Sequence, residues 1–193
     1  MTTAGLDRTA RREREILDVA ARLFSQRGYS STTIRDIGAE AGLNHATTNY
    51  YFRGKASVLF AIYQEALDGF FAGLDTVTGR PDEALAHVVR VAVAAAVHRR
   101  DETAVYFQEL RWLDRLLPPD MATIVQERQR RFRASVCEIV EDGIAQGLFR
   151  PVDPLIAVEA VVAMARWAYQ NDATPGPDAA EECARFVVNG LRP

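Results

Sequence analysis

The stretch SSTTIRDIGAEAGLNHATTNYYFRGK, residues 30–55, decides how the rest of the chain is interpreted. Its apolar residues Ile34, Ile37 and Ala41 follow one another at intervals of three and four, which places them on one face of a helix. Gly42 stands where this helix must stop and the chain must turn, because glycine tolerates positive φ. The stretch therefore predicts a short helix that ends in a tight turn.

A second short helix is predicted directly after this turn. Thr32 or Thr33 can cap the first helix and Asn44 the second, because their side-chain oxygens accept hydrogen bonds from otherwise unpaired N–H groups. Phe52 is an apolar anchor, and the remaining side chains are mostly polar or amphipathic: His45, Thr47, Thr48, Asn49, Tyr50 and Tyr51. Such a helix suits contacts with base edges and phosphates better than a core. The pattern predicts a helix-turn-helix.

The same pattern is compatible with a solvated helical hairpin, because short motifs also match by chance. The wider context favours DNA binding, since residues 11–60 resemble the DNA-binding domain of the TetR family of bacterial transcriptional regulators. The residues that carry the resemblance are Phe24, Gly28, Thr33, Ile37, Ala41, Gly42, Tyr50, Phe52 and Lys55. The family often has a large apolar residue at the position of Thr48 and Tyr at that of Asn49, so this chain departs from the pattern there.

The resulting hypothesis assigns DNA contacts to eight residues. Thr33 and Arg35 would contact phosphate or a base edge at the start of the first motif helix. The major groove would be faced by Asn44, His45, Thr47 and Tyr50, and the DNA backbone would be held by Tyr51 and Lys55. Arg8, Arg11 and Arg12 are either further phosphate contacts or a solvated charged face.

Composition indicates an ordinary globular protein with uneven charge. The chain has 193 residues, of which 48% are hydrophobic and 25% charged, and a net charge of −3. Residues 1–55 contain nine Arg or Lys and six Asp or Glu, a balance of +3, whereas the others contain fourteen and twenty, a balance of −6. A mildly basic head on an acidic body fits local contact with DNA. We expect no signal peptide and no membrane span, hence a cytoplasmic protein.

The whole chain is expected to be all-α. Residues 1–8 are predicted to be a flexible arm, and helices are predicted at 9–27, 56–74, 81–99, 102–117, 119–146, 153–171 and 177–191, separated by breaks such as TVTGRP, GLFRPVDP and ATPGP. We expect two domains. Residues 1–55 would form a three-helix helix-turn-helix domain, and residues 56–193 a larger helical domain that, as the resemblance implies, binds a small molecule and forms a dimer.

Candidate ligand residues combine arginine with aromatic side chains in the segments AVYFQELRWLDRLL and MARWAYQ. They are Phe107, Arg111, Trp112, Arg166 and Trp167. Arginine beside an aromatic ring in an apolar helix suits an anionic ligand with an apolar body. The alternative is structural: Arg111 would pair with Glu109 or Asp114, and the aromatic rings would be core.

The segments YFQELRWL and RQRRFRASVCEIVEDGIAQGLFRPVDPLIAVEAVVAMARWAY also resemble the ligand domain of TetR regulators that sense CoA thioesters in lipid or sterol catabolism. This resemblance implies an acyl-CoA-like effector. The basic run Arg128, Arg130, Arg131 and Arg133 would then meet CoA phosphates, although a charge run on a helix is more often a solvated face.

The predicted function is that of a homodimeric, sequence-specific transcriptional repressor. It would bind a palindromic double-stranded operator through two heads, about 34–36 Å apart, and a small-molecule effector would release it. The resemblance implies that the last two helices of each protomer pack into a four-helix bundle in the dimer, whereas in a monomer their broad apolar faces would be core. A small-molecule-binding helical protein that does not read DNA is the alternative function.

The sequence gives little support to an enzyme. His45, His87 and His98 have no spacing that joins them to cysteines or carboxylates in a metal site, and no nucleophile elbow, P-loop or dinucleotide-binding glycine pattern is present. Cys137 and Cys183 are expected to be buried thiols. The sequence therefore predicts no catalytic residue, no metal and no cofactor.

Overall fold

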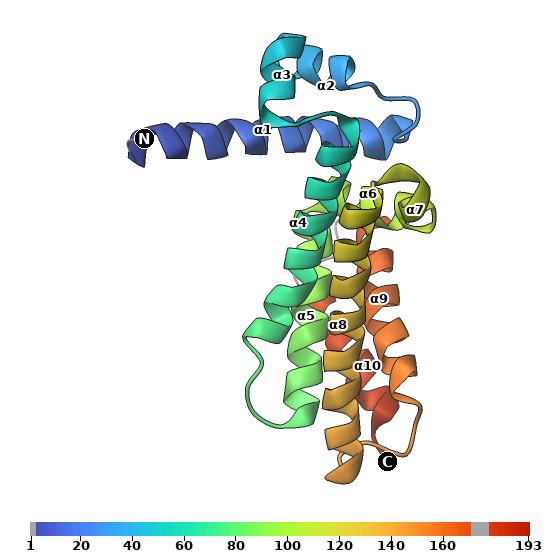
Figure 1. Ribbon diagram of the computed structural model, residues 1–193. Helices are drawn as coiled ribbons and strands as arrows, with labels where there is room; N and C mark the ends of the chain where they lie inside the picture. Colours follow the sequence, from blue (N-terminus) through green and yellow to red (C-terminus); the bar gives the residue numbers. More distant parts are fainter. Residues whose placement is uncertain (1–2, 171–177) are drawn as a thin grey trace.

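The computed structural model describes residues 3–170 and 178–193, and these residues contain helices and no strand (Figure 1). In chain order the helices are α1 (Thr3–Arg27), α2 (Ile34–Glu40), α3 (His45–Tyr51), α4 (Lys55–Asp75), α5 (Pro81–His98), α6 (Arg100–Glu109), the 3-10 helix η1 (Leu110–Trp112), α7 (Leu113–Leu116), α8 (Pro119–Ala145), α9 (Pro154–Gln170) and α10 (Ala179–Leu191). The predicted all-α class is confirmed.

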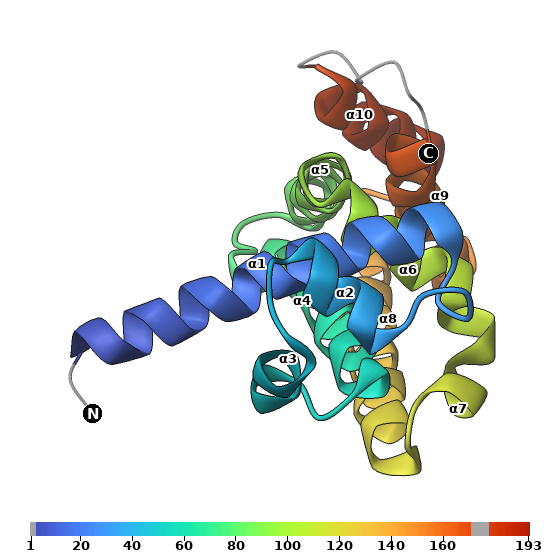
Figure 2. The ribbon, with the colours of Figure 1, turned by 90° about the horizontal axis from the view of Figure 1, so that it is seen from above.

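The helices form a small head and an elongated body. The body is a bundle in which α4, α5, α8, α9 and α10 run along the length of the molecule, and α1 lies across one end of it (Figure 1). Helices α2 and α3 lie on the side of α1 that faces away from the bundle, whereas α6 lies beneath the C-terminal half of α1 (Figure 2). We call α1–α3 the head and α4–α10 the body.

Helix α4 joins the two parts by burying side chains along most of its length. Val58, Leu59 and Ile62 are inaccessible to solvent near its start, and Phe70 and Phe71 are almost so near its end. The helix packs against α1 in the head and against α5, α6 and α8 in the body. The domain boundary predicted after residue 55 falls at the start of this shared helix.

Both motif helices begin with the side-chain caps that the sequence predicts. Thr33 caps α2: its Oγ1 accepts a hydrogen bond from the Asp36 N–H at 3.2 Å, and the Asp36 carboxylate accepts one from the Thr33 N–H at 2.8 Å. This capping box holds the pKa of Asp36 below its usual range. Asn44 caps α3 by accepting from the Thr47 N–H at 2.8 Å. The turn between the two helices contains Gly42 at φ +67°.

Some predicted boundaries are wrong. The arm predicted at 1–8 is helical from Thr3 onward, as part of α1. The single helix predicted at 102–117 is α6, η1 and α7, although no glycine or proline occurs before Pro118 to signal a break. The break coincides with Glu109, whose carboxylate contacts the head. Residues 171 and 177, and the ATPGP break between the last two helices, lie outside the described residues.

Close packing of α2 on α3 depends on Gly38. A Cβ atom at this position would lie 2.5 Å from Thr48 Oγ1 and 3.3 Å from the Leu43 carbonyl oxygen. Thr48 is completely buried, and its hydroxyl donates to the Asn44 carbonyl at 3.0 Å. The departure from the family pattern at residue 48 therefore has a structural role: the small, anchored threonine fits the space that Gly38 leaves.

We expect Gly38→Ala to lower the free energy of unfolding by about 1–3 kcal/mol, because the added methyl group overpacks this contact. Thr48→Ala in the same chain should restore part of the loss by removing the clashing hydroxyl. Urea denaturation followed by circular dichroism measures both changes.

Gly190→Ala is the matched control. Gly190 also lies in a helix, and nothing lies within 4 Å of its added Cβ. Alanine should therefore be neutral or stabilising there. A loss in the double variant equal to that of Gly38→Ala alone would contradict this account.

Candidate nucleic-acid interface and internal cavity

The outer surface of the head exposes the residues that the sequence assigns to the major groove. His45 and Asn44 are exposed, and Thr47 and Tyr51 are partly so. Tyr50 is 79% exposed and stands edge-on to the Tyr51 ring, with centroids 5.3 Å apart. A tyrosine this exposed adds nothing to the core, so it is available to a partner.

Asn49, which the sequence analysis did not select, orients His45. The amide nitrogen of Asn49 lies 3.2 Å from His45 Nδ1, one helical turn away. This contact restrains the imidazole ring on the surface of α3. The spacing of four residues between His45 and Asn49, about one helical turn, is the signal by which the sequence could have identified this pair.

Several residues predicted to contact DNA, among them Thr33, Asn44 and Thr47, already use their polar atoms in hydrogen bonds that cap helices. Asn44 Oδ1 accepts from both the N–H and the hydroxyl of Thr47, and the Thr33 hydroxyl donates to Asp36 at 2.7 Å. Their observed role is to fix the starts of α2 and α3. Their DNA contacts stay predictions.

The structure places Lys55 in a different role from the one expected. Its ammonium group donates to the Tyr29 carbonyl oxygen at 2.8 Å and lies 4.0 Å from the centroid of the Tyr29 ring. Burial lowers its pKa, and the nearby Glu109 carboxylate partly offsets that effect. Lys55 therefore ties the start of α4 to the turn after α1, and its contact with the DNA backbone stays a prediction.

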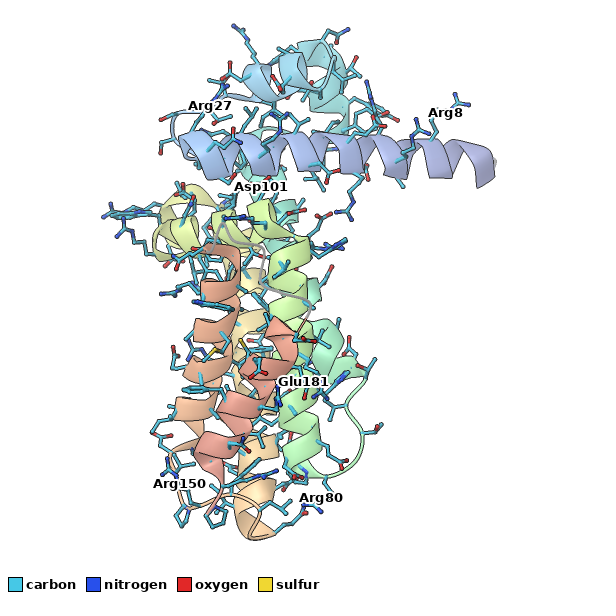
Figure 3. The ribbon with its side chains drawn as sticks, turned by 180° about the vertical axis from the view of Figure 1, so that it is seen from behind. Arg8, Arg27, Arg80, Asp101, Arg150 and Glu181 are labelled. Atoms are coloured by element: carbon cyan, nitrogen blue, oxygen red, sulfur yellow. The ribbon has the colours of Figure 1, made fainter. Side chains whose placement is uncertain are left out.

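Cations other than Lys55 are more available on the head. Arg35 and Arg53 are exposed and form no ion pair within residues 3–170 and 178–193. Arg53 was missed because nothing but its charge distinguishes it in the sequence. Arg11 and Arg12 both pair with Glu15, which favours a solvated charged face for them. Arg8 lies on the part of α1 that extends beyond the body (Figure 3).

A partly open cavity of about 140 Å³ lies between α4, α6, α8 and α9 of the body, and its lining includes the exposed residues Arg133, Glu159 and Arg166. Most of its lining is apolar or aromatic: Leu67, Phe70, Tyr106, Phe107, Leu110, Phe132, Val161, Val162 and Ala165, together with Gln129, Arg133, Glu159 and Arg166. Tyr106, Phe70 and Phe132 make edge-on or tilted ring contacts with one another or with Phe107.

The charges at the cavity are unequal. Arg133 forms an ion pair with Glu159 at 2.9 Å, so these two neutralise each other. Arg166 lies over the Phe107 ring, 4.9 Å from its centroid, and has no carboxylate partner in the described part of the chain. The cavity therefore carries one uncompensated positive charge.

Only two of the five predicted ligand residues line this cavity. Phe107 and Arg166 do so, whereas Arg111 and Trp112 lie on the exposed surface of η1. The structural alternative, in which Arg111 pairs with Glu109 or Asp114, is not observed among the described residues: the Arg111 guanidinium lies over the Trp112 ring at 5.1 Å. The Arg115 guanidinium lies 5.0 Å from the same ring centroid. Prediction placed these residues together because it assumed one continuous helix through residue 117.

Trp167, the fifth residue, belongs to a different surface. With Met164, Cys183 and Phe186 it lines an open groove between α9 and α10. Trp167 is 44% exposed and Phe186 is 72% exposed. Arg166, which directly precedes Trp167, lines the cavity instead. Successive residues of a helix differ in direction by about 100°, so the two side chains lie on different faces of α9.

The basic run on α8 is largely neutralised. Arg128 pairs with Asp68, Arg130 with Glu127, and Arg133 with Glu159, while Arg131 lies over the Phe71 ring. The described residues contain no group of three or more His, Cys, Asp or Glu side chains placed to hold a metal. They also contain no helix long and apolar enough to cross a bilayer.

Comparison with known protein families matches nearly the whole chain. Residues 16–62 match the family described as bacterial regulatory proteins of the tetR family, and residues 78–191 match the tetracycline repressor-like C-terminal domain. The first match contains the capped helices, and the second contains the groove and the lining of the cavity except Leu67 and Phe70.

Individual relatives agree with these matches. The repressor KstR2 of Mycolicibacterium smegmatis is 32% identical over 146 residues, which cover 74% of this chain and 69% of KstR2. The structure of AibR in complex with isovaleryl coenzyme A and operator DNA is 27% identical, with a TM-score of 0.78 over 94% of this chain and 98% of AibR. The ketosteroid regulator KstR2 of Mycobacterium tuberculosis, at 24% identity and a TM-score of 0.80 over 94% and 95% of the two chains, shares the fold.

We expect His45→Ala to weaken binding to the cognate DNA site by about 1–3 kcal/mol if the imidazole contacts a base. Fluorescence anisotropy on the chain's own upstream DNA and on a scrambled duplex measures the loss. His87→Ala is the matched control, because His87 contacts Thr76 in the body and should leave both affinities unchanged. Equal losses of His45→Ala on both duplexes would rule out base reading.

Proposed function

Because the chain belongs to the TetR family of bacterial regulatory proteins, we propose that it is a homodimeric repressor that a small ligand in the body cavity releases from its operator. Members of this family are transcriptional regulators and not enzymes, and they bind operator DNA as dimers. The observation that carries the proposal is that a head with an exposed, doubly capped helix pair rests on a body that contains a cavity. Since it acts on chromosomal DNA, we place the protein in the cytoplasm.

DNA reading is assigned to the exposed side chains of α3. His45, Thr47 and Tyr50 contact base edges in the major groove, and Asn49 keeps the imidazole in place. Arg35 and Arg53 join Tyr51 as backbone contacts, because these two guanidiniums are exposed and lack ion pairs within the described residues. Lys55 contributes mainly by holding the head together.

The dimer is formed by the outer faces of α9 and α10. Phe186 and Trp167 expose large aromatic surfaces beside the groove, and Leu155 and Ile156 are 49% and 56% exposed near the start of α9. Large apolar side chains exposed together beside a groove mark an interaction surface. A second copy of the chain provides the complementary apolar face under twofold symmetry.

The effector has a short apolar part and an anionic or strongly polar part. A dry cavity of about 150 Å³ accommodates benzene, so a cavity of about 140 Å³ fits a branched or straight acyl group of similar size. A steroid nucleus is too large for it. Arg166, the uncompensated cation, supports a ligand with negative charge or a carbonyl group close to the apolar part.

A coenzyme A thioester supplies both parts. Its acyl group would occupy the cavity, and its phosphates would reach Arg111 and Arg115, which flank the Trp112 ring on the segment that follows Leu110 of the cavity lining. An indole between two guanidiniums suits an anionic nucleotide. The complex of AibR with isovaleryl coenzyme A supports this ligand class for a chain of the same fold.

The first experiment separates a DNA-reading repressor from a ligand-binding protein that does not read DNA. Fluorescence anisotropy compares the upstream duplex with a scrambled duplex at two salt concentrations, and isovaleryl-CoA is then titrated into the complex. Selective binding that the thioester reverses supports the proposal. Binding that is weak and unselective, with heat released by the thioester in calorimetry, would favour the alternative.

We expect Phe186→Arg to yield a monomer and to weaken operator binding more than tenfold, since a charge replaces a large apolar contact and removes the second head. Light scattering after size exclusion measures the mass. Ile124→Arg is the control: Ile124 is 47% exposed on α8, away from the groove, and its replacement should leave the dimer intact. A dimeric Phe186→Arg protein would place the interface elsewhere.

We expect Arg166→Ala to weaken isovaleryl-CoA binding about tenfold through loss of a charge-assisted contact. The double change Arg111→Ala with Arg115→Ala should weaken the thioester but not free isovalerate, because only the thioester carries phosphates. Calorimetric titration measures each affinity, and Arg130→Ala, an exposed arginine paired with Glu127, is the control. Equal effects of all three changes would indicate non-specific charge attraction.

A further inference from the structure

Besides the Lys55 contact, three polar contacts between described residues tie the head to the body. Arg14 of α1 pairs with Glu65 of α4, and the Ser25 hydroxyl donates to the Asp101 carboxylate at 2.6 Å. Asp101 lies directly against α1 at the start of α6 (Figure 3). The third contact is the hydrogen bond from the Tyr29 N–H to Glu109 Oε1, at 3.1 Å. Together these contacts seat the head on α4 and α6.

The Glu109 contact is the one that adjoins the cavity. Glu109 is the last residue of α6, and its neighbours Phe107 and Leu110 both line the cavity. Here the helix changes from α to 3-10 geometry. Asp101, at the other end of α6, is not among the lining residues. A change in the cavity therefore reaches Glu109 without passing through Asp101.

On the head side, the contact leads directly to the helix-turn-helix. The backbone of Tyr29 makes both contacts. Its N–H donates to Glu109, and its carbonyl oxygen accepts from Lys55 at 2.8 Å. The Tyr29 ring packs edge-on against Phe24 and under the Lys55 ammonium. Tyr29 thus connects the end of α1, the start of α4 and the end of α6.

The hydroxyl of Tyr63 is the candidate for a second hydrogen-bond donor to Glu109. The hydroxyl of Tyr63 is buried and is the one buried side-chain polar atom without a hydrogen-bond partner in the described residues. Buried polar groups without partners are rare and need an explanation. Tyr63 packs against Tyr106, which lies one helical turn before Glu109 on the same face of α6. Burial raises the pKa of Tyr63, and the negative charge of Glu109 raises it further.

Tyr63 also contacts the cavity through one ring. It stands edge-on to Tyr106, with centroids 5.7 Å apart, and Tyr106 lines the cavity and accepts a hydrogen bond from Gln129. Groups that fill the cavity therefore press on Tyr106, next to Tyr63, and on Phe107 and Leu110, next to Glu109.

We propose that the Glu109 carboxylate is a two-position acceptor that couples the cavity to the head. With the cavity empty it holds the Tyr29 N–H, and with the cavity filled it accepts from the Tyr63 hydroxyl and releases Tyr29. Release loosens the turn that Tyr29 and Lys55 hold, and the head loses its DNA-binding orientation. Glu109 and Tyr63 are positioning residues, and the inference rests on the proposed ligand control of DNA binding.

The test fills the cavity without any ligand. Val162→Phe adds a ring to the lining and imitates occupancy, and Ala165→Leu is a second filler should the first fail to fold. We expect either filler to weaken binding to the upstream duplex at least tenfold and to accelerate hydrogen exchange of the Tyr29 amide. Anisotropy and NMR measure the two effects.

Tyr63→Phe then removes the second donor. In the filled protein it should return DNA affinity and Tyr29 amide protection to within about threefold of the wild type, and in the unfilled protein it should change neither. Asp101→Asn in the filled protein is the matched control, since it weakens a head–body contact away from the cavity and should restore nothing. A double variant as weak as the filled protein would overturn the proposal, as would equal restoration by Asp101→Asn.

Glu109→Gln tests the acceptor itself. The neutral amide accepts more weakly, so DNA affinity should fall before any filler is added, and filling should then have less effect. A parallel experiment uses isovaleryl-CoA as the ligand in place of the filling substitutions. If it fails to bind while the filled variants behave as expected, the ligand class is wrong and the coupling stands. If it releases DNA equally from wild type and Tyr63→Phe, the coupling is wrong and the ligand class stands.

Discussion

The arrangement of the head on the body depends on one helix, α4, whose buried face packs against both parts. The buried face of α4 continues from Val58 and Leu59, against the head, to Phe70 and Phe71, against the body. A continuous helix transmits rotation and translation along its length, because each residue is hydrogen-bonded to its neighbours one turn away. The head therefore has no independent hinge at residue 55. Its orientation is set by how α4 and α6 lie in the body.

The cavity occupies the place where that orientation can be changed. Its walls come from α4, α6, α8 and α9, so the two helices that contact the head, α4 and α6, are also walls of the cavity. A protein interior packs too tightly to absorb an added group by uniform compression. A group larger than the cavity must displace one of its walls, and the wall at α6 ends next to Glu109, where the helix changes to 3-10 geometry.

Which structural features could be predicted from the sequence depended on how far apart in the chain the contacting residues lie. The caps by Thr33 and Asn44 and the turn at Gly42 are local, involving atoms within four residues, and the sequence predicted them. The role of Lys55 was not predictable, because its partner Tyr29 is 26 residues away. Likewise, no local signal marks the break after Glu109. The break coincides with the contact between Glu109 and the head, and one missed break was enough to misplace Arg111 and Trp112 with respect to the cavity.

Lys55 is the only lysine in the chain. Apart from the amino terminus, the protein therefore offers amine-directed chemistry a single target, and that target is the half-buried group that fastens the head. Acylation of this nitrogen would abolish its charge and its contact with the Tyr29 ring. Coupling to a surface or dye through amines would modify the protein at the contact between the head and α4, whereas its two thiols, Cys137 and Cys183, lie in the body. The rate at which this one amine reacts is a chemical measure of how firmly the head is seated.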